Sequence, residues 1–179
     1  MMHQDKLMFK FIVLLSILLC VSCTKNTDED FDEVELKSNY ESYSGAYSKL
    51  KDMMNTDSKE MAIFEIGIDS IGDYKFDGDG WYKNYKEYVS YDVVLGVYML
   101  SDERIQNYIG LLKETGAQKV EFYRGNVAIT VLANGFVFGG CLSQIYFHPV
   151  KTELERPSWT TTYYSARFSE NWSGETKCN

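Results

Sequence analysis

Proline and histidine are both scarce in this 179-residue chain. The prolines are Pro149 and Pro157, and the histidines are His3 and His148. Because zinc sites are built mainly from several His and Cys ligands, one histidine in the body of the chain excludes a histidine-rich zinc site. With so few prolines, the breaks between secondary-structure elements must be read mainly from Gly and Asn.

Clusters of Lys and Arg are also missing. The chain has 18 Lys plus Arg against 26 Asp plus Glu, which gives a net charge of −8. A negative surface repels phosphate backbones, so we expect no nucleic-acid partner. No glycine-rich stretch precedes a predicted helix, which excludes the usual phosphate-binding loops.

The N-terminal apolar run is too short for a membrane span. Lys6 and Lys10 precede FIVLLSILL at residues 11–19, whereas a membrane-spanning helix needs about 20 apolar residues. A basic start, a short apolar run and small residues after it are typical of a secretory signal peptide. We therefore predict that residues 1–22 are a cleaved signal peptide.

The leader ends in Val21-Ser22 and is followed by Cys23, and these three residues resemble the lipobox of Gram-negative bacterial lipoproteins. The resemblance implies that Cys23 carries lipid such as palmitate and attaches the protein to a membrane. It also implies a place in the bacterial cell envelope, as an outer-membrane lipoprotein facing the periplasm or the cell surface. Cys20 stands where the lipobox normally has Leu, and an ordinary secretory peptide cut nearby is the alternative.

An acidic segment, TKNTDEDFDEVE at residues 24–35, follows the lipobox. It contains too few apolar residues for a core. We predict that residues 23–35 form a lipidated cysteine and a disordered tether, and that residues 36–179 form a single domain. The acidic run also resembles the surface-export signal of some lipoproteins, and a plain spacer is the alternative.

Two cysteines, Cys141 and Cys178, remain beyond the leader and lipobox. Because disulfides form in exported proteins, we predict a Cys141–Cys178 disulfide that holds the C-terminal tail. Two free thiols are the alternative. A nucleophilic pair of Cys141 with His148 would require free thiols.

The first half of the domain predicts helices. A stripe of apolar and aromatic residues at spacings of three and four indicates an amphipathic helix, with Leu36, Tyr40, Tyr43, Tyr47, Leu50 and Met54 on one face. Ser101 as N-cap and Gly116 as stop bound another helix. Residues 85–100 predict a buried helix, and residues 61–69 favour a short helix or an irregular segment.

Strands are expected in the second half, where the apolar period changes to two. Asn134-Gly135 predicts a tight hairpin, which sets Ile129 opposite Gly140 and places Cys141 on the other face of the sheet. A further strand is expected from Ser158, followed by a polar tail. The fold class is therefore α+β, with N-terminal amphipathic helices packed on a C-terminal antiparallel β-meander.

The sequence offers little for metal or acid–base chemistry. An EF-hand loop around Asp77-Gly78-Asp79-Gly80 would place Lys75 and Lys86 at ligand positions, so a turn that exposes Trp81 is the better interpretation and irregular calcium binding the alternative. We expect no metal and no cofactor. Carboxylate pairs such as Glu170 with Glu175 are expected by chance in an acidic chain.

Aromatic residues make up 15% of the chain. Four are expected to be partly exposed and to bind a partner: Trp81, Tyr163, Tyr164 and Trp172. Aromatic faces beside carboxylates and amides suit sugars or protein interfaces, although most aromatic residues pack in cores.

We therefore predict a non-catalytic binding or structural-interaction protein with a protein or glycan partner. The alternatives are an immunity or inhibitor protein against a secreted toxin, and a hydrolase that uses surface carboxylates. The stretches ANGFVFGG and FSENW make the domain similar to bacterial lipoproteins without a defined activity. That resemblance supplies no functional residues.

Overall fold

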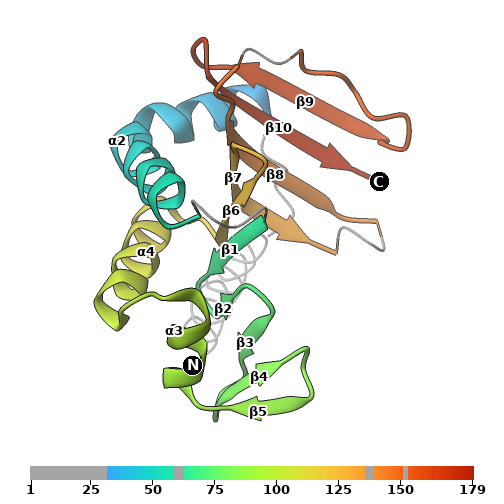
Figure 1. Ribbon diagram of the computed structural model, residues 1–179. Coiled ribbons are helices and arrows are strands. Elements are labelled where there is room, and N and C mark those ends of the chain that lie inside the picture. The colour runs from blue at the N-terminus through green and yellow to red at the C-terminus, as the bar shows by residue number, and fades with distance from the viewer. Residues whose placement is uncertain (1–31, 59–62, 136–138, 151–152) are drawn as a thin grey trace, which may run out of the picture.

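The computed structural model describes residues 32–58, 63–135, 139–150 and 153–179. These residues form three helices and ten strands (Figure 1). The elements, in chain order, are α2 (Glu33–Asp57), β1 (Ile63–Gly67), β2 (Ser70–Ile71), β3 (Tyr74–Phe76), β4 (Trp81–Lys83), β5 (Glu87–Val89), α3 (Tyr91–Tyr98), α4 (Asp102–Thr115), β6 (Lys119–Tyr123), β7 (Asn126–Asn134), β8 (Cys141–Phe147), β9 (Thr162–Arg167) and β10 (Trp172–Cys178).

All strand pairs in the described residues are antiparallel and belong to one sheet, in the order β5-β4-β3-β2-β1-β6-β7-β8-β10-β9. The expected mixed α+β class with a β-rich C-terminal region is confirmed. Five strands nevertheless lie between α2 and α3 in the sequence. The chain therefore does not divide into helices first and strands afterwards.

Two of the predicted helices are present, and capping groups define where each begins. In α2, the carboxylate of Asp32 accepts a hydrogen bond from the Glu35 amide at 2.9 Å, and the Glu35 carboxylate accepts one from the Asp32 amide at 3.0 Å. This capping box starts the helix at Glu33, so residues 33–35 are helical and the prediction that they belong to a disordered tether is wrong. In α4, Ser101 caps the N-terminus and Gly116 ends the helix at φ 70°.

The helices and one face of the sheet share the core. From α2 and α4, the cluster takes Leu36, Tyr47, Leu50, Met54, Ile105, Tyr108 and Leu112. Its members from the central strands alternate along each strand and so belong to one face: Phe64, Ile66, Val120, Val127, Ile129 and Ile145. Figure 1 shows α2 and α4 on the same side of the sheet. Burying each such side chain contributes about 1.5–3 kcal/mol.

Two segments differ from the prediction: residues 61–69, for which a short helix or an irregular segment is favoured, and residues 85–100, for which a buried helix is expected. Residues 63–67 form strand β1, because Phe64 and Ile66 alternate with Glu65 and both point into the core. Residues 85–100 divide into strand β5 and the short helix α3. Within α3, Val94 is buried, whereas Val93 and Val97 are 50% and 51% exposed, so the expectation of a single buried helix is wrong.

The predicted register of the Asn-Gly hairpin is also wrong. Ile129 pairs with Ile145 rather than Gly140, and Asn134 pairs with Cys141. The connection therefore spans residues 135–140, of which 136–138 lie outside the described residues. A bulge between Thr130 and Leu132 shifts the register further. As a result, Cys141 lies on the same face as Ile129, not on the opposite one.

Strand β10 replaces the polar tail that the sequence suggests. It lies between β8 and β9 and pairs with both along its length. Its core-facing positions include Gly174, where a side chain would meet the Phe168 ring, and Thr176, so the strand lacks a strong apolar period. Backbone hydrogen bonds to two neighbouring strands hold β10 in the sheet, although its amino-acid composition does not favour a strand.

The predicted disulfide is confirmed. Cys141 of β8 and Cys178 of β10 are directly paired, with Cα atoms 4.2 Å apart, and their sulfur atoms are bonded. The bond therefore joins two neighbouring strands near the C-terminus. With both sulfurs in a disulfide, the alternative of a Cys141–His148 nucleophile pair no longer applies.

Candidate functional site

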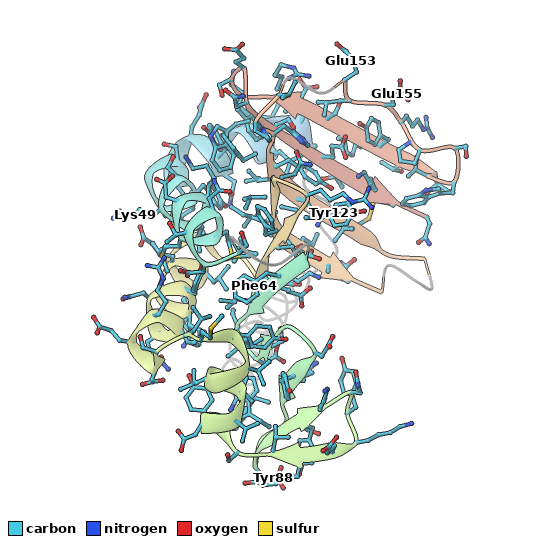
Figure 2. The ribbon with its side chains drawn as sticks, in the orientation of Figure 1. Lys49, Phe64, Tyr88, Tyr123, Glu153 and Glu155 are labelled. Carbon is cyan, nitrogen blue, oxygen red and sulfur yellow. A yellow bond between two sulfur atoms is a disulfide. The ribbon has the colours of Figure 1, made fainter. Side chains whose placement is uncertain are left out.

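The face of the sheet opposite α2 and α4, called the open face here, carries mainly polar side chains. It includes Glu65, Lys119, Glu121, Tyr123, Asn126, Ala128, Thr130, Gln144, Tyr146, His148, Tyr163, Glu175 and Lys177, which alternate with the core residues along their strands. Figure 2 shows Tyr123 on the side of the molecule away from Lys49 of α2. Loops and helices are the commoner location of binding residues, but an antiparallel sheet with one solvated face can also present them.

A hollow of about 320 Å³ lies on the open face. Its centre is Ala128 on β7, which pairs with Glu121 of β6 on one side and Tyr146 of β8 on the other. Because alanine has only a methyl group, the longer side chains of the flanking strands stand above it as walls. The lining consists of Glu121, Tyr123, Asn126, Ala128, Gln144, Tyr146 and His148.

His148 is held rigidly at the end of strand β8. Its ring stacks on Tyr146 with centroids 5.6 Å apart and planes 15° apart. Its backbone amide donates to the Asn171 carbonyl at 2.9 Å, and Asn171 Nδ2 donates back to the His148 carbonyl at 2.8 Å. These contacts fix both the backbone and the ring plane of His148.

The tautomer of His148 follows from Asn126. Asn126 Nδ2 donates to the Tyr123 carbonyl at 3.4 Å, which turns its Oδ1 towards His148 Nδ1 at 3.1 Å. Nδ1 therefore carries the proton and donates, and Nε2 is an acceptor. Burial lowers the pKa of His148; Arg167 lowers it further and Glu175 opposes the shift. The imidazole is therefore neutral at pH 7.

We expect the pKa of His148 to lie below the value of about 6.5 that is usual for histidine. The corresponding folding free energy is fully present above about pH 6.5 and is lost as the pH falls through the folded pKa. In a His3→Gln variant, His148 is the single histidine, so an NMR titration of the folded protein reports it alone. The same titration in urea gives the unfolded reference, and a folded pKa at or above that reference would contradict the prediction.

Tyr146 belongs to a hydrogen-bonded network that crosses β7, β8 and β10. Its hydroxyl donates to Gln144 Oε1 at 2.6 Å and accepts from Lys177 Nζ at 3.3 Å. Gln144 Nε2 donates in turn to Thr130 Oγ1 at 3.1 Å. Burial raises the pKa of Tyr146 although Lys177 acts in the opposite direction. The phenol therefore stays protonated, and Lys177 does not make it a base.

The two lysines nearest the hollow are compensated by carboxylates. Lys119 Nζ lies 2.9 Å from Glu65 and 3.1 Å from Glu121, and Lys177 pairs with Glu175. Burial alone would lower the pKa of each lysine, but these contacts outweigh it and raise the pKa of both. Both ammonium groups are therefore charged and already paired.

The four aromatic residues singled out from sequence do not form one patch. Tyr163 lies on the open face and donates to Glu175 Oε1 at 2.9 Å; burial and this bond raise its pKa to about 12. Tyr164, its neighbour, has the opposite orientation and is 38% exposed. Strand β9, which carries both, is at one end of the sheet, whereas Trp81 of β4 is near the other.

The two tryptophans among these four residues, Trp81 and Trp172, are less available than the sequence suggests. Trp172 is only 7% exposed, because its ring packs against Tyr40 and Phe147 with centroids 5.5 and 5.4 Å away. The expectation that Trp172 is partly exposed is therefore wrong. Trp81 is half-buried and stacks on Tyr91 with centroids 5.4 Å apart. Both rings stabilise the fold.

The sequence prediction missed the residues that line the hollow. Gln144 and Tyr146 of β8 and His148 just after it recur at every second position, which is a polar stripe that could have been read from the sequence. Ala128 carries no such signal, because its importance comes from the longer residues beside it. Cys23 lies outside the described residues.

Another hollow, of about 360 Å³, lies beside β2 and β3 and contains several carboxylates. Asp69 pairs with Lys75 at 3.5 Å, and Glu65 pairs with Lys119. In the described residues, no three or more His, Cys, Asp or Glu side chains are grouped so as to hold a metal ion. Within the same residues, none of the helices has the length and apolar character to cross a membrane.

The Ala128 hollow is thus a rigid, aromatic and largely charge-compensated recess on the solvated side of the sheet. Its histidine is neutral, its buried phenol is protonated and its neighbouring lysines are paired. Comparison of the chain with protein families, with curated proteins and with solved structures finds no match.

Proposed function

We propose that this protein is a lipid-anchored, non-catalytic binding protein of the bacterial cell envelope, and that it binds its ligand in the Ala128 hollow. The observation that carries the binding role is the hollow itself, which is lined by six residues of three neighbouring strands and by His148 directly after β8. Its volume of about 320 Å³ lies at the lower end of the range for ligand sites, about 300–1,000 Å³.

The chemistry of the lining favours holding a ligand over transforming it. His148 Nδ1 faces the amide oxygen of Asn126, whereas a catalytic imidazole is commonly oriented by a carboxylate. The pKa of Tyr146 is raised rather than lowered, so its phenol is poorly suited to act as a base. The groups are fixed by mutual hydrogen bonds, which is the pre-organisation that a binding site needs.

The fold suits a protein displayed from a membrane. In the proposed architecture, α2 and α4 pack on one side of the β-meander and leave the open face for the ligand. The lipid at Cys23 would be separated from Asp32, the N-cap of α2, by eight residues, which reach at most about 30 Å when extended. The hollow would therefore act close to the membrane that carries the anchor.

Filling the hollow is expected to weaken binding without unfolding the protein. Ala128 is half-exposed, so Ala128→Trp directs its ring into the recess, and tryptophan is favourable in strands. Immobilised wild type and variant are exposed to detergent-solubilised envelope and to its soluble glycan fraction, and retained material is quantified by mass spectrometry. We expect Ala128→Trp to retain about ten-fold less of the component that wild type retains, a loss of about 1.4 kcal/mol.

Ala133→Trp is the matched control. Ala133 is exposed on the same strand and face, and it pairs with Leu142 beyond the bulge and outside the hollow. It should retain the same component as wild type. Equal retention by all three proteins, with equal urea midpoints, would contradict a ligand site at Ala128.

A further inference from the structure

The amides of the hollow have hydrogen-bonding capacity to spare. A side-chain amide offers two N–H donors and two acceptor lone pairs. Gln144 uses one donor towards Thr130 and one lone pair for Tyr146. Asn126 likewise uses one donor towards the Tyr123 carbonyl and one lone pair for His148. Counted over the described residues, each amide keeps one donor and one acceptor at the wall of the hollow.

A ligand hydroxyl matches this pattern, because it donates one hydrogen bond and accepts others. Glu121 adds an acceptor from the opposite wall, and His148 adds ring nitrogen Nε2, also an acceptor in the tautomer assigned above. A ligand that presents several hydroxyls at fixed angles could therefore bond to both walls at once. A carboxylate or phosphate, which only accepts, would place its oxygens against Glu121 and Nε2, which accept as well.

The charges of the open face disfavour ionic ligands. Lys119 lies between two carboxylates and Lys177 is paired with Glu175, so an anion would have to displace an existing partner. His148 is neutral at pH 7, because burial lowers its pKa. A cation would compete with Lys119 for Glu121 at 3.1 Å. Compensation of these two lysines therefore disfavours an ionic ligand that would bind through them.

Aromatic surface beside these polar groups suits a ring with apolar C–H faces. Tyr123 is 49% exposed on one wall. The opposite wall is formed by the parallel rings of Tyr146 and His148. The two walls stand on β6 and β8, which flank β7. Because neighbouring strands are about 4.8 Å apart, the backbones of β6 and β8 are separated by about 9.6 Å. This trough is wide enough for a single sugar ring above the Ala128 methyl group.

We propose that the ligand of the Ala128 hollow is a neutral saccharide, bound through its hydroxyls to Glu121, Asn126 and Gln144 and through a ring face to the aromatic walls. This inference rests on the proposed binding function. It specifies a glycan rather than a protein partner. It also implies that the site distinguishes uncharged sugars from charged ones.

The test uses a panel of neutral oligosaccharides as probes. Hexamers of glucose, mannose, galactose, xylose and N-acetylglucosamine are each added at about 10 mM, which nearly saturates a site with a Kd of about 1 mM. Two charged counterparts complete the panel: oligogalacturonate, matched to the galactose oligomer, and deacetylated chitosan, matched to the N-acetylglucosamine oligomer. The His148 ring signals of the His3→Gln protein report binding at the wall of the hollow.

We expect at least one neutral oligomer to shift the His148 signals at pH 7. Where the panel contains a charged counterpart of that oligomer, the counterpart should bind at least ten-fold more weakly. The same oligomer should not shift them in His3→Gln/Ala128→Trp and should shift them in His3→Gln/Ala133→Trp. Absence of a shift with every neutral oligomer, or tighter binding of a charged counterpart, would overturn the saccharide inference. If Ala128-dependent retention of envelope material persists in that case, the binding function stands and the ligand class is wrong; if it is also absent, both fail.

Discussion

Reduction of the Cys141–Cys178 disulfide is expected to lower the free energy of unfolding by about 4 kcal/mol. The bond closes a loop with a sequence separation of 37 residues, for which the chain-entropy relation gives about 4 kcal/mol at room temperature. Typical domains are stable by only about 5–15 kcal/mol, so this is a large share of the total. The bond also fixes the pairing of β8 with β10, which has little apolar surface of its own.

Urea unfolding with and without reductant measures this effect. The double variant Cys141→Ala/Cys178→Ala serves as the control, because reductant should leave its midpoint unchanged. We expect the reduced wild type and the double variant to unfold at similar urea concentrations, both well below the oxidised protein. Coincident curves for oxidised and reduced wild type would show that the disulfide does not constrain the unfolded chain as argued.

Asp57→Ala is expected to destabilise the protein by about 3 kcal/mol, because it removes the shared acceptor of a partly buried network. Asp57 accepts from Arg104 Nε at 2.7 Å and from the Tyr108 hydroxyl at 2.8 Å. Its side chain is 11% exposed and Tyr108 is fully buried. The network joins the end of α2 to α4, and without the carboxylate the buried phenol and the guanidinium lose their partner.

Asp52→Ala on the same helix is the matched control. Asp52 pairs with the adjacent Lys51, but its side chain is 69% exposed, and such surface pairs contribute less than about 1 kcal/mol. Tyr108→Phe should cost about 1 kcal/mol, since it removes the donor and leaves Asp57 paired with Arg104. Similar urea midpoints for Asp52→Ala and Asp57→Ala would show that the buried network does not stabilise the junction of the helices.

The parts of the fold that sequence could predict are those decided by local contacts. Helix α4 is bounded by the Ser101 cap and by Gly116 in a left-handed conformation, both of which act within one turn. The stripe of α2 is visible because its residues recur at helical spacing. Strand β10 could not be recognised in this way, since it is held by backbone bonds to β8 and β9 rather than by its own apolar pattern.

The candidate site depends on register, which local sequence did not reveal. The hollow exists because Ala128 lies between Glu121 and Tyr146. The predicted two-residue turn put Ile129 opposite Gly140 and so gave Ala128 the wrong neighbours. Aromatic content pointed towards a binding role, but of the four residues selected for it, only Tyr163 lies on the open face. The exposure of an aromatic side chain depends on which strands and helices lie beside it, and composition does not reveal this.

The position of β10 has a consequence for when this protein can fold. It follows β9 in the chain but lies between β8 and β9 in the sheet, and β9 reaches the sheet through it. During synthesis, β9 therefore has no strand to pair with until β10 has been added, so this end of the sheet cannot form before then. Under the proposed export, this order would delay pairing of β9 until after transport, in a compartment where the Cys141–Cys178 disulfide can form.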